Sequence, residues 1–290
     1  MTTIHIADDW LDAVRASLGA RAELVTRLEP AIPAGYDELN DPSIAALDFV
    51  NIDALANGPA DLTAYLLQRS DGSWRFRIYR RGESIPLADM LPLLDQLGLR
   101  ALDERAFGFG FEGATVWLHD VGVAVPSGVQ LTDAVKAEVQ RCFMAEFTGS
   151  IEVDGLNRLV MLAGLTARQI EILRGYSRYL RQIGFPFSQQ YIEATLARHS
   201  SISRLLAALF TARFTPGVGV AESGADLRAE IIEALDAVPS LDDDRTVRSL
   251  LALIDATVRT NAFRPSDEGG YRPVLAFKFD TSKVPDLPLP

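Results

Sequence analysis

The chain has 290 residues, of which 48% are hydrophobic and 23% charged, a composition typical of a globular protein with a sizeable core. Its 28 basic and 39 acidic residues leave a formal net charge of −11, which argues against a nucleic-acid partner because phosphate contacts need a basic face. One cysteine, Cys142, excludes an internal disulfide framework and a cysteine-rich zinc site. The sequence shows neither an apolar run of membrane-spanning length nor a signal-peptide pattern, so we expect a cytoplasmic protein without a membrane partner.

Residues 1–56 predict a helical lead-in. Apolar residues recur at helical spacing between Trp10 and Leu28, and prolines and a glycine then interrupt the pattern. A further helix is predicted from Pro42 to about Ala56, with Asp48 and Phe49 on its apolar stripe.

Residues 57–150 predict an α+β domain. The predicted order is β-β-α-β-β-α, with strands at 62–67, 74–81, 99–109 and 114–125, a helix that ends near Gly98 and a long helix that ends near Phe147. From Trp74 onward this is the β-α-β-β-α order of a ferredoxin-like core, and the first strand can take the remaining sheet position. We therefore expect one antiparallel sheet with two helices on one face.

The rest of the chain predicts an all-helical domain, 151–268, and a terminal strand with an extended tail, 269–290. Thr166 and Gln169 form a capping-box pattern for one helix. Helices are predicted over 166–184, 188–210, 226–237 and 242–263, and a strand is predicted over 271–279. The proline-rich ending predicts that the chain continues beyond Pro290.

No complete active site can be read from the residues. Gly108, Gly110 and Gly113 match a dinucleotide-binding pattern, but a strand follows them instead of a helix, which favours a glycine-rich hairpin. His119 has no partner in metal-ligand spacing, and its neighbour Asp120 points to the opposite face of the strand, which favours a structural role.

Two further clusters have structural explanations. The acidic run 242–244 lies at a predicted helix start, where the helix dipole stabilises carboxylates. This explanation is favoured over a carboxylate metal site. The aromatic and arginine-rich stretch 174–191 follows helical spacing, which favours a core with a solvated face, although it could also pack on another domain.

Several segments together carry a specific resemblance. Their order and spacing are those of the large bacterial NAD-dependent glutamate dehydrogenases, and the segments are Phe76–Arg100, Asp103–Arg105, Val116–Asp120, Gly164–Gly184 and Phe277–Pro290. The resemblance covers most of the chain and is weakest before about Ala34. It implies an internal fragment: the last ACT-type regulatory domain, the helical region after it, and the opening of the catalytic part.

The resemblance implies a parent enzyme that converts L-glutamate and NAD to 2-oxoglutarate, ammonia and NADH. The catalytic lysine and nucleotide-binding glycines of the family come after the matching segments, so no catalytic, cofactor-binding or metal-binding residue is assigned here. Lys278 and Lys283 lie in the matching tail, but nothing identifies either as the catalytic lysine. The implied partners are the rest of the parent polypeptide and other subunits of a homo-oligomer.

ACT-type domains bind amino acids at a strand-to-helix turn, which here comprises Arg80, Arg81, Gly82, Glu83 and Ser84. By that analogy, an amino-acid effector would use the free amide groups at the helix start. The main alternative is a stand-alone ACT-type amino-acid sensor or adaptor, and a small complete enzyme with an unrecognised site is a third possibility. The chain by itself is expected to lack dehydrogenase activity.

Overall fold

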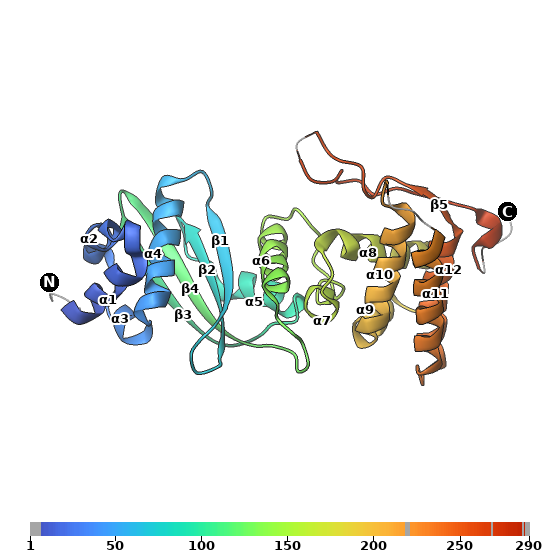
Figure 1. The fold of residues 1–290 in the computed structure, drawn as a ribbon, viewed down its shortest axis with the longest axis horizontal. Helices are drawn as coiled ribbons and strands as arrows, with labels where there is room; N and C mark the ends of the chain where they lie inside the picture. The colour runs from blue at the N-terminus through green and yellow to red at the C-terminus, as the bar shows by residue number, and fades with distance from the viewer. Residues whose placement is uncertain (1–6, 218–220, 268, 286, 288–290) are drawn as a thin grey trace. The chain divides into compact units, whose positions relative to one another are not determined.

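The computed structural model describes residues 7–217, 221–267, 269–285 and 287 (Figure 1). It divides into two compact units, each of which is described by itself. Unit 1 comprises Met1–Asp95, Leu99–Val125 and Phe143–Thr148, and unit 2 comprises Gln96–Gly98, Pro126–Cys142 and Gly149–Pro290.

A four-stranded antiparallel sheet organises unit 1. Its strands are β1 (Leu62–Gln68), β2 (Trp74–Arg81), β3 (Arg100–Phe111) and β4 (Ala114–Ala124), and they lie in the order β1-β2-β4-β3. The first strand therefore takes the free position beside β2, which confirms the predicted ferredoxin-like arrangement. The Asp71–Gly72 turn joins β1 to β2 as predicted, with Gly72 at φ +84°.

One face of the sheet packs against α5 (Leu87–Gln96) and the end of α6 (Asp133–Phe147). Helix α5 buries Met90 and Leu94, and Phe143 packs edge-on against Phe76 of β2 with ring centroids 5.0 Å apart. Gly98 has a φ of +83°, as expected for the residue that ends a helix.

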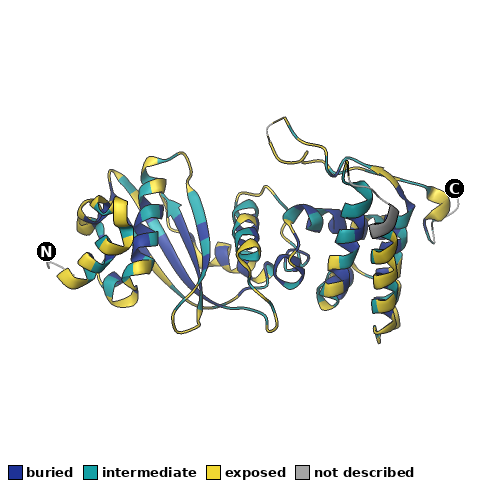
Figure 2. Cartoon of the chain, viewed as in Figure 1, coloured by how far each residue is buried: buried dark blue, intermediate teal, exposed yellow. Residues whose placement is uncertain are grey.

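The helical lead-in covers the other face of the sheet (Figure 1). It consists of α1 (Asp8–Leu18), α2 (Glu23–Leu28), α3 (Tyr36–Leu39) and α4 (Pro42–Asn57), which share one hydrophobic core with Tyr79, Phe107, Phe109, Val116 and Leu118 of the sheet. Strand β2 is consequently buried on both faces, as the dark strands of Figure 2 show. The sequence predicted helices on one face of the sheet but did not assign the lead-in to the other.

Unit 2 is mainly helical. Its helices after α6 are α7 (Leu159–Ala163), α8 (Ala167–Gln182), α9 (Gln189–Arg198), α10 (Ser200–Phe214), α11 (Ala221–Asp236) and α12 (Leu241–Ala256). The predicted capping box of α8 is present, because Thr166 accepts from the Gln169 amide and the Gln169 side chain accepts from the Thr166 amide.

Three predicted helix boundaries in unit 2 were wrong. The helix predicted over 226–237 begins earlier, at Ala221. The helix predicted over 188–210 is divided at His199, whose φ of −103° and ψ of +51° separate α9 from α10. The helix predicted over 242–263 ends at Ala256, where the chain enters β5 (Thr257–Thr260). Strand β5 pairs with β6 (Phe277–Phe279), so the backbone groups of these residues pair with another strand rather than with a preceding helical turn.

The strand predicted over 271–279 is shorter than expected. Only Phe277–Phe279 forms β6, and Tyr271 makes an isolated bridge to Pro265. Between them, the Asn261 side chain donates to the carbonyl of Val274 and accepts from the amide of Ala276. Side-chain hydrogen bonds thus replace a regular ladder in this segment.

Candidate functional site

The turn between β2 and α5 contains the residues that the sequence singled out. Gly82 has a φ of +95°, and its amide donates to the carbonyl of Thr115 on β4 at 2.8 Å. The Arg81 guanidinium is committed to the structure, since it contacts Asp61 and donates to the carbonyls of Leu55 and Gly58. A positive φ favours glycine at position 82, so sequence and hydrogen bonding together determine the path of the turn.

His119 supports the turn from the sheet. Its side chain is 1% exposed, its Nδ1 lies 2.8 Å from Glu104, and its Nε2 accepts from the Ile85 amide at 3.0 Å. Because an amide can only donate, Nε2 is unprotonated and the ring proton lies on Nδ1, where it is donated to Glu104.

Ser84, His119 and Glu104 resemble a Ser-His-Glu catalytic triad, but the geometry argues against that role. The Ser84 Oγ is 3.4 Å from Nε2, and the Ile85 amide already uses the lone pair that a general base needs. The arrangement therefore positions the turn. Sequence reasoning interpreted His119 as structural, but it did not find its partners, which come from strand register and a distant turn.

The remaining residues of the turn are accessible. Glu83 and Ser84 are exposed, and within the described chain their amides donate to no other protein group. The Arg80 guanidinium lies 5.2 Å from the centre of the Phe147 ring. The turn can thus offer two amide donors to a carboxylate.

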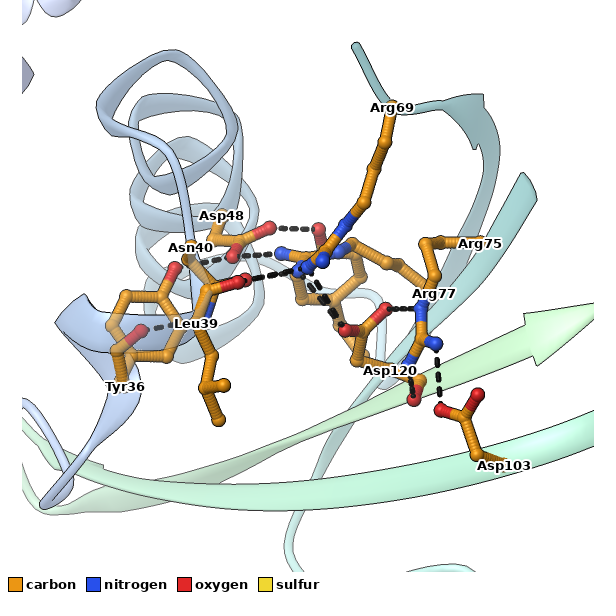
Figure 3. A network of polar contacts seen from close by, with 10 residues as sticks. Tyr36, Leu39, Asn40, Asp48, Arg69, Arg75, Arg77, Asp103 and Asp120 are labelled. Carbon is orange, nitrogen blue, oxygen red and sulfur yellow. Dashed lines mark hydrogen bonds and ion pairs between the residues drawn. The ribbon is translucent and has the colours of Figure 1, made fainter. Parts of the chain in front are cut away.

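A buried polar network lies on the opposite face of the sheet (Figure 3). Arg77 of β2 is fully buried, contacts Asp48 of α4 and Asn40, and lies 3.3 Å from Asp120 of β4. These contacts link the helical lead-in directly to the two central strands. Burying an arginine is unfavourable unless carboxylates compensate it, and this site supplies two.

Asp48 is the acceptor at the centre of this network. Its carboxylate accepts from Arg77, from the Tyr36 hydroxyl, and from the Tyr79 hydroxyl at 2.5 Å. Burial raises the pKa of Asp48, although these donors partly offset the effect. Burial also raises the pKa of Tyr36 and of Tyr79, and the adjacent carboxylate raises both further. Burial by itself would lower the pKa of Arg77, but Asp48 and Asp120 raise it overall.

The network continues along β2 to Arg75. Its Nε donates to Asp120 at 2.9 Å and its Nη1 to Asp103 at 2.6 Å, while Arg69 approaches Asp120 at 3.6 Å. Gly122 lies opposite Arg75 in the register, and a Cβ at Gly122 would come within 2.6 Å of the Arg75 guanidinium. This glycine therefore leaves room for the Arg75–Asp103 pair.

The other sequence-predicted clusters have structural explanations. The Gly108–Gly113 segment is the β3–β4 hairpin, with Glu112 and Gly113 at positive φ, which confirms the hairpin interpretation. Cys142 is buried, and His5 lies outside the described residues. No group of three or more potential metal ligands occurs in the described part of the chain. Likewise, no described helix is long and apolar enough to cross a membrane.

The acidic run at the start of α12 differs in detail from the prediction. Asp243 is buried and accepts from Tyr191, Thr195, Arg198 and His199. Burial by itself would raise the pKa of Asp243, but these donors, with His199 and Arg198 foremost, hold it well below the usual Asp value. Asp243 thus joins α9 and α12, a role that the dipole argument did not reveal.

The four-stranded sheet, with α5 and the end of α6 on one face, has the arrangement of an ACT-type domain, and a helical region follows it in the chain. Comparison with family models identifies the particular family. Residues 59–136 match the ACT3 domain of glutamate dehydrogenase, 151–216 match its helical motif 3, and 230–290 match the catalytic domain of bacterial NAD-glutamate dehydrogenase. The chain belongs to the bacterial NAD-dependent glutamate dehydrogenase family. The third match begins within α11, so it includes α12, which the sequence analysis assigned to the helical domain.

Curated relatives agree with this assignment. The NAD-specific glutamate dehydrogenase of Halomonas elongata is 36% identical over 289 residues, which are 98% of this chain and 18% of that protein. The corresponding proteins of Pseudomonas aeruginosa and Mycobacterium tuberculosis are 32% and 34% identical and are covered over 18% and 17% of their lengths. The chain thus corresponds to less than a fifth of the length of these relatives.

Proposed function

We propose that this chain is the regulatory and oligomerising segment of an NAD-dependent glutamate dehydrogenase and has no catalytic activity by itself. In the whole protein, L-glutamate would be oxidised to 2-oxoglutarate and ammonia with reduction of NAD. NAD would bind elsewhere in the polypeptide, and the remainder of that polypeptide and other subunits would be the partners of this segment. A cytoplasmic location is part of the same proposal.

The observation that carries the regulatory proposal is the exposed turn after β2. The amides of Glu83 and Ser84 donate to no protein group in the described part of the chain, Arg80 lies just before them at the end of β2, and His119 accepts from the amide of the adjacent Ile85. A carboxylate ligand would accept from these donors without displacing an existing hydrogen bond. We propose an amino acid as the effector, because ACT-type domains bind such ligands at this turn.

The catalytic part of the proposal is tested by mixing the purified chain with L-glutamate and NAD and following NADH absorbance. We expect no turnover. The positive control is a polypeptide as long as the curated relatives, which should produce NADH under the same conditions. Turnover by the 290-residue chain at a normal enzymatic rate would contradict the proposal and favour a small complete enzyme.

The effector is tested by thermal unfolding in the presence of individual amino acids. A ligand present at about 100 times its Kd adds about 2.7 kcal/mol to the stability of the state that binds it. Tryptophan fluorescence is the appropriate signal, because Trp10, Trp74 and Trp117 all lie in unit 1. Arg80→Gln should reduce the shift and Arg100→Gln, on the exposed end of β3, should not. Unchanged melting with every amino acid would refute an effector at the turn.

A further inference from the structure

A groove in unit 2 is separate from the turn discussed above. It encloses about 610 Å³, within the range of small-molecule sites. It is lined by a face of α8 that includes Arg178 and Tyr179 and by alternate residues of the 273–279 segment, which packs against that helix. Residues 149–152 close one side of the groove.

Opposite charges face each other in this groove. Arg178 donates two hydrogen bonds to Glu152, one of them 2.7 Å long, and both side chains are more than half exposed. The other two charged lining residues are already paired, Arg174 with Asp154 and Glu171 with Arg168. Arg178 and Glu152 therefore form the one exposed ion pair among the lining residues, and such a pair contributes about 0–1 kcal/mol to stability.

An aromatic ledge lies next to this ion pair. Tyr179 stacks on Phe279 with ring centroids 4.4 Å apart, and Phe277 lies 6.0 Å from Phe279. Gly175 allows this packing, because a Cβ there would lie 2.7 Å from the Phe277 ring. The groove thus combines a fixed apolar surface with two adjacent, opposite charges that can be separated at low cost.

We propose that this groove binds the zwitterion of an α-amino acid with an apolar or aromatic side chain. The ligand carboxylate would pair with Arg178, its ammonium group with Glu152, and its side chain would lie on the Tyr179–Phe279 ledge. A ligand with only a negative charge would pair with Arg178 but would be repelled by Glu152. A ligand with only a positive charge would pair with Glu152 but would be repelled by Arg178. A zwitterion separates Arg178 from Glu152 but gives each of them a new partner of opposite charge.

The test is isothermal titration of the 290-residue chain with L-phenylalanine. We expect saturable binding with one site in the groove. Two analogues isolate the charges, because 3-phenylpropionate lacks the ammonium group and 2-phenylethylamine lacks the carboxylate. Each analogue should bind at least about tenfold more weakly than L-phenylalanine.

Variants locate the binding site. Arg178→Gln and Glu152→Gln should each weaken binding at least about tenfold, whereas Arg248→Gln should leave it unchanged. Arg248 is a suitable control because it is an exposed arginine that also forms an ion pair, with Asp244 on α12, and it does not line the groove. A circular-dichroism melt confirms that each variant is folded.

Three outcomes would overturn the proposal. The first is no saturable binding of L-phenylalanine, and the second is binding of either analogue as tight as that of L-phenylalanine. The third is binding that Arg80→Gln abolishes while Arg178→Gln does not, which would assign the ligand to the turn in unit 1. The groove proposal can therefore fail while the effector at the turn stands, and the reverse also holds.

Discussion

The two units use different interactions to join their layers. In unit 1, charged and hydroxyl groups around Arg77 and Asp48 connect the helical lead-in to the sheet. In unit 2, aromatic rings make the comparable connection, since Tyr176 packs on Phe210 and Phe277 with centroids 5.9 and 4.6 Å apart. We therefore expect that removing one partner leaves a buried charge uncompensated in unit 1, whereas the contact between α8 and β6 in unit 2 is sensitive to changes in side-chain volume.

Unfolding of unit 1 can be measured by itself, because all three tryptophans belong to unit 1. Tryptophan fluorescence therefore follows unfolding of the sheet unit, and circular dichroism at helical wavelengths also follows unit 2.

The largest effect is expected for Arg77→Met. This change leaves Asp48 and Asp120 buried without their shared cation, which costs about 3–5 kcal/mol. The midpoint of urea unfolding measured by tryptophan fluorescence should fall sharply. Arg100→Met, at an exposed end of β3, should change it little, and equal effects of the two substitutions would show that the buried network is unimportant for stability.

A pair of glycine substitutions tests packing in unit 2. Gly175→Ala should destabilise by about 1–3 kcal/mol, because the new Cβ would displace the Phe277 ring. Gly224→Ala in α11 should stabilise by up to about 1 kcal/mol, since nothing lies within 4 Å of its Cβ position and alanine favours helix. Circular-dichroism melting measures both, and a stabilising Gly175→Ala would contradict the close packing of Phe277.

The pH dependence of unit 2 should depend on Asp243. Its pKa is lowered in the folded state, so its carboxylate stabilises the fold above the unfolded-state value near 3.8, and this contribution is lost as the pH falls through the lower folded-state value. We expect Asp243→Asn to cost about 1–3 kcal/mol at pH 7, because the charge-assisted hydrogen bonds are lost. Urea titrations followed by circular dichroism should show this deficit constant from pH 7 to 5 and shrinking below about pH 4. A deficit independent of pH down to 2 would contradict the assignment.

The smallest effect is expected for Ser84→Ala. Within the described chain, the polar contact of its Oγ is one of 3.4 Å with His119, so the change in stability should stay within about 0.5 kcal/mol. His119→Ala should cost about 1–3 kcal/mol by comparison, because it leaves the Ile85 amide without an acceptor. If Ser84→Ala were as damaging as His119→Ala in fluorescence-detected unfolding, the serine would have a role beyond the turn.

Local patterns in the sequence predicted much of the fold. Strand alternation in 74–81, the Asp71–Gly72 turn and the Thr166–Gln169 capping box each depend on neighbouring residues, so they can be read without tertiary information. The family resemblance also predicted a strand-to-helix turn at residues 80–84, and the structure shows that turn between β2 and α5, while its role in binding a ligand stays a prediction. The structural roles of the turn residues were not predicted, because the partners of Arg81 and the support from His119 come from other segments.

Two of the boundaries that failed are decided by distant contacts. Val258 continues the apolar spacing of α12 but is 61% exposed, because pairing with β6 takes the chain out of the helix at Thr257. The break at His199 lies where its Nε2 meets Asp243 at 2.9 Å, a contact between residues 44 positions apart. Helical periodicity contains no information about either partner.

By itself, the sequence determined the strand and helix order of the ACT-type domain, the hairpin nature of the Gly108–Gly113 segment, and membership of a dehydrogenase family. These follow from local spacing and from the linear order of motifs. Only the tertiary structure showed that the helical lead-in covers the second face of the sheet, with Arg77 and Asp48 buried between them. Burial of that ion pair depends on register and layer packing, which bring together residues that the chain holds far apart.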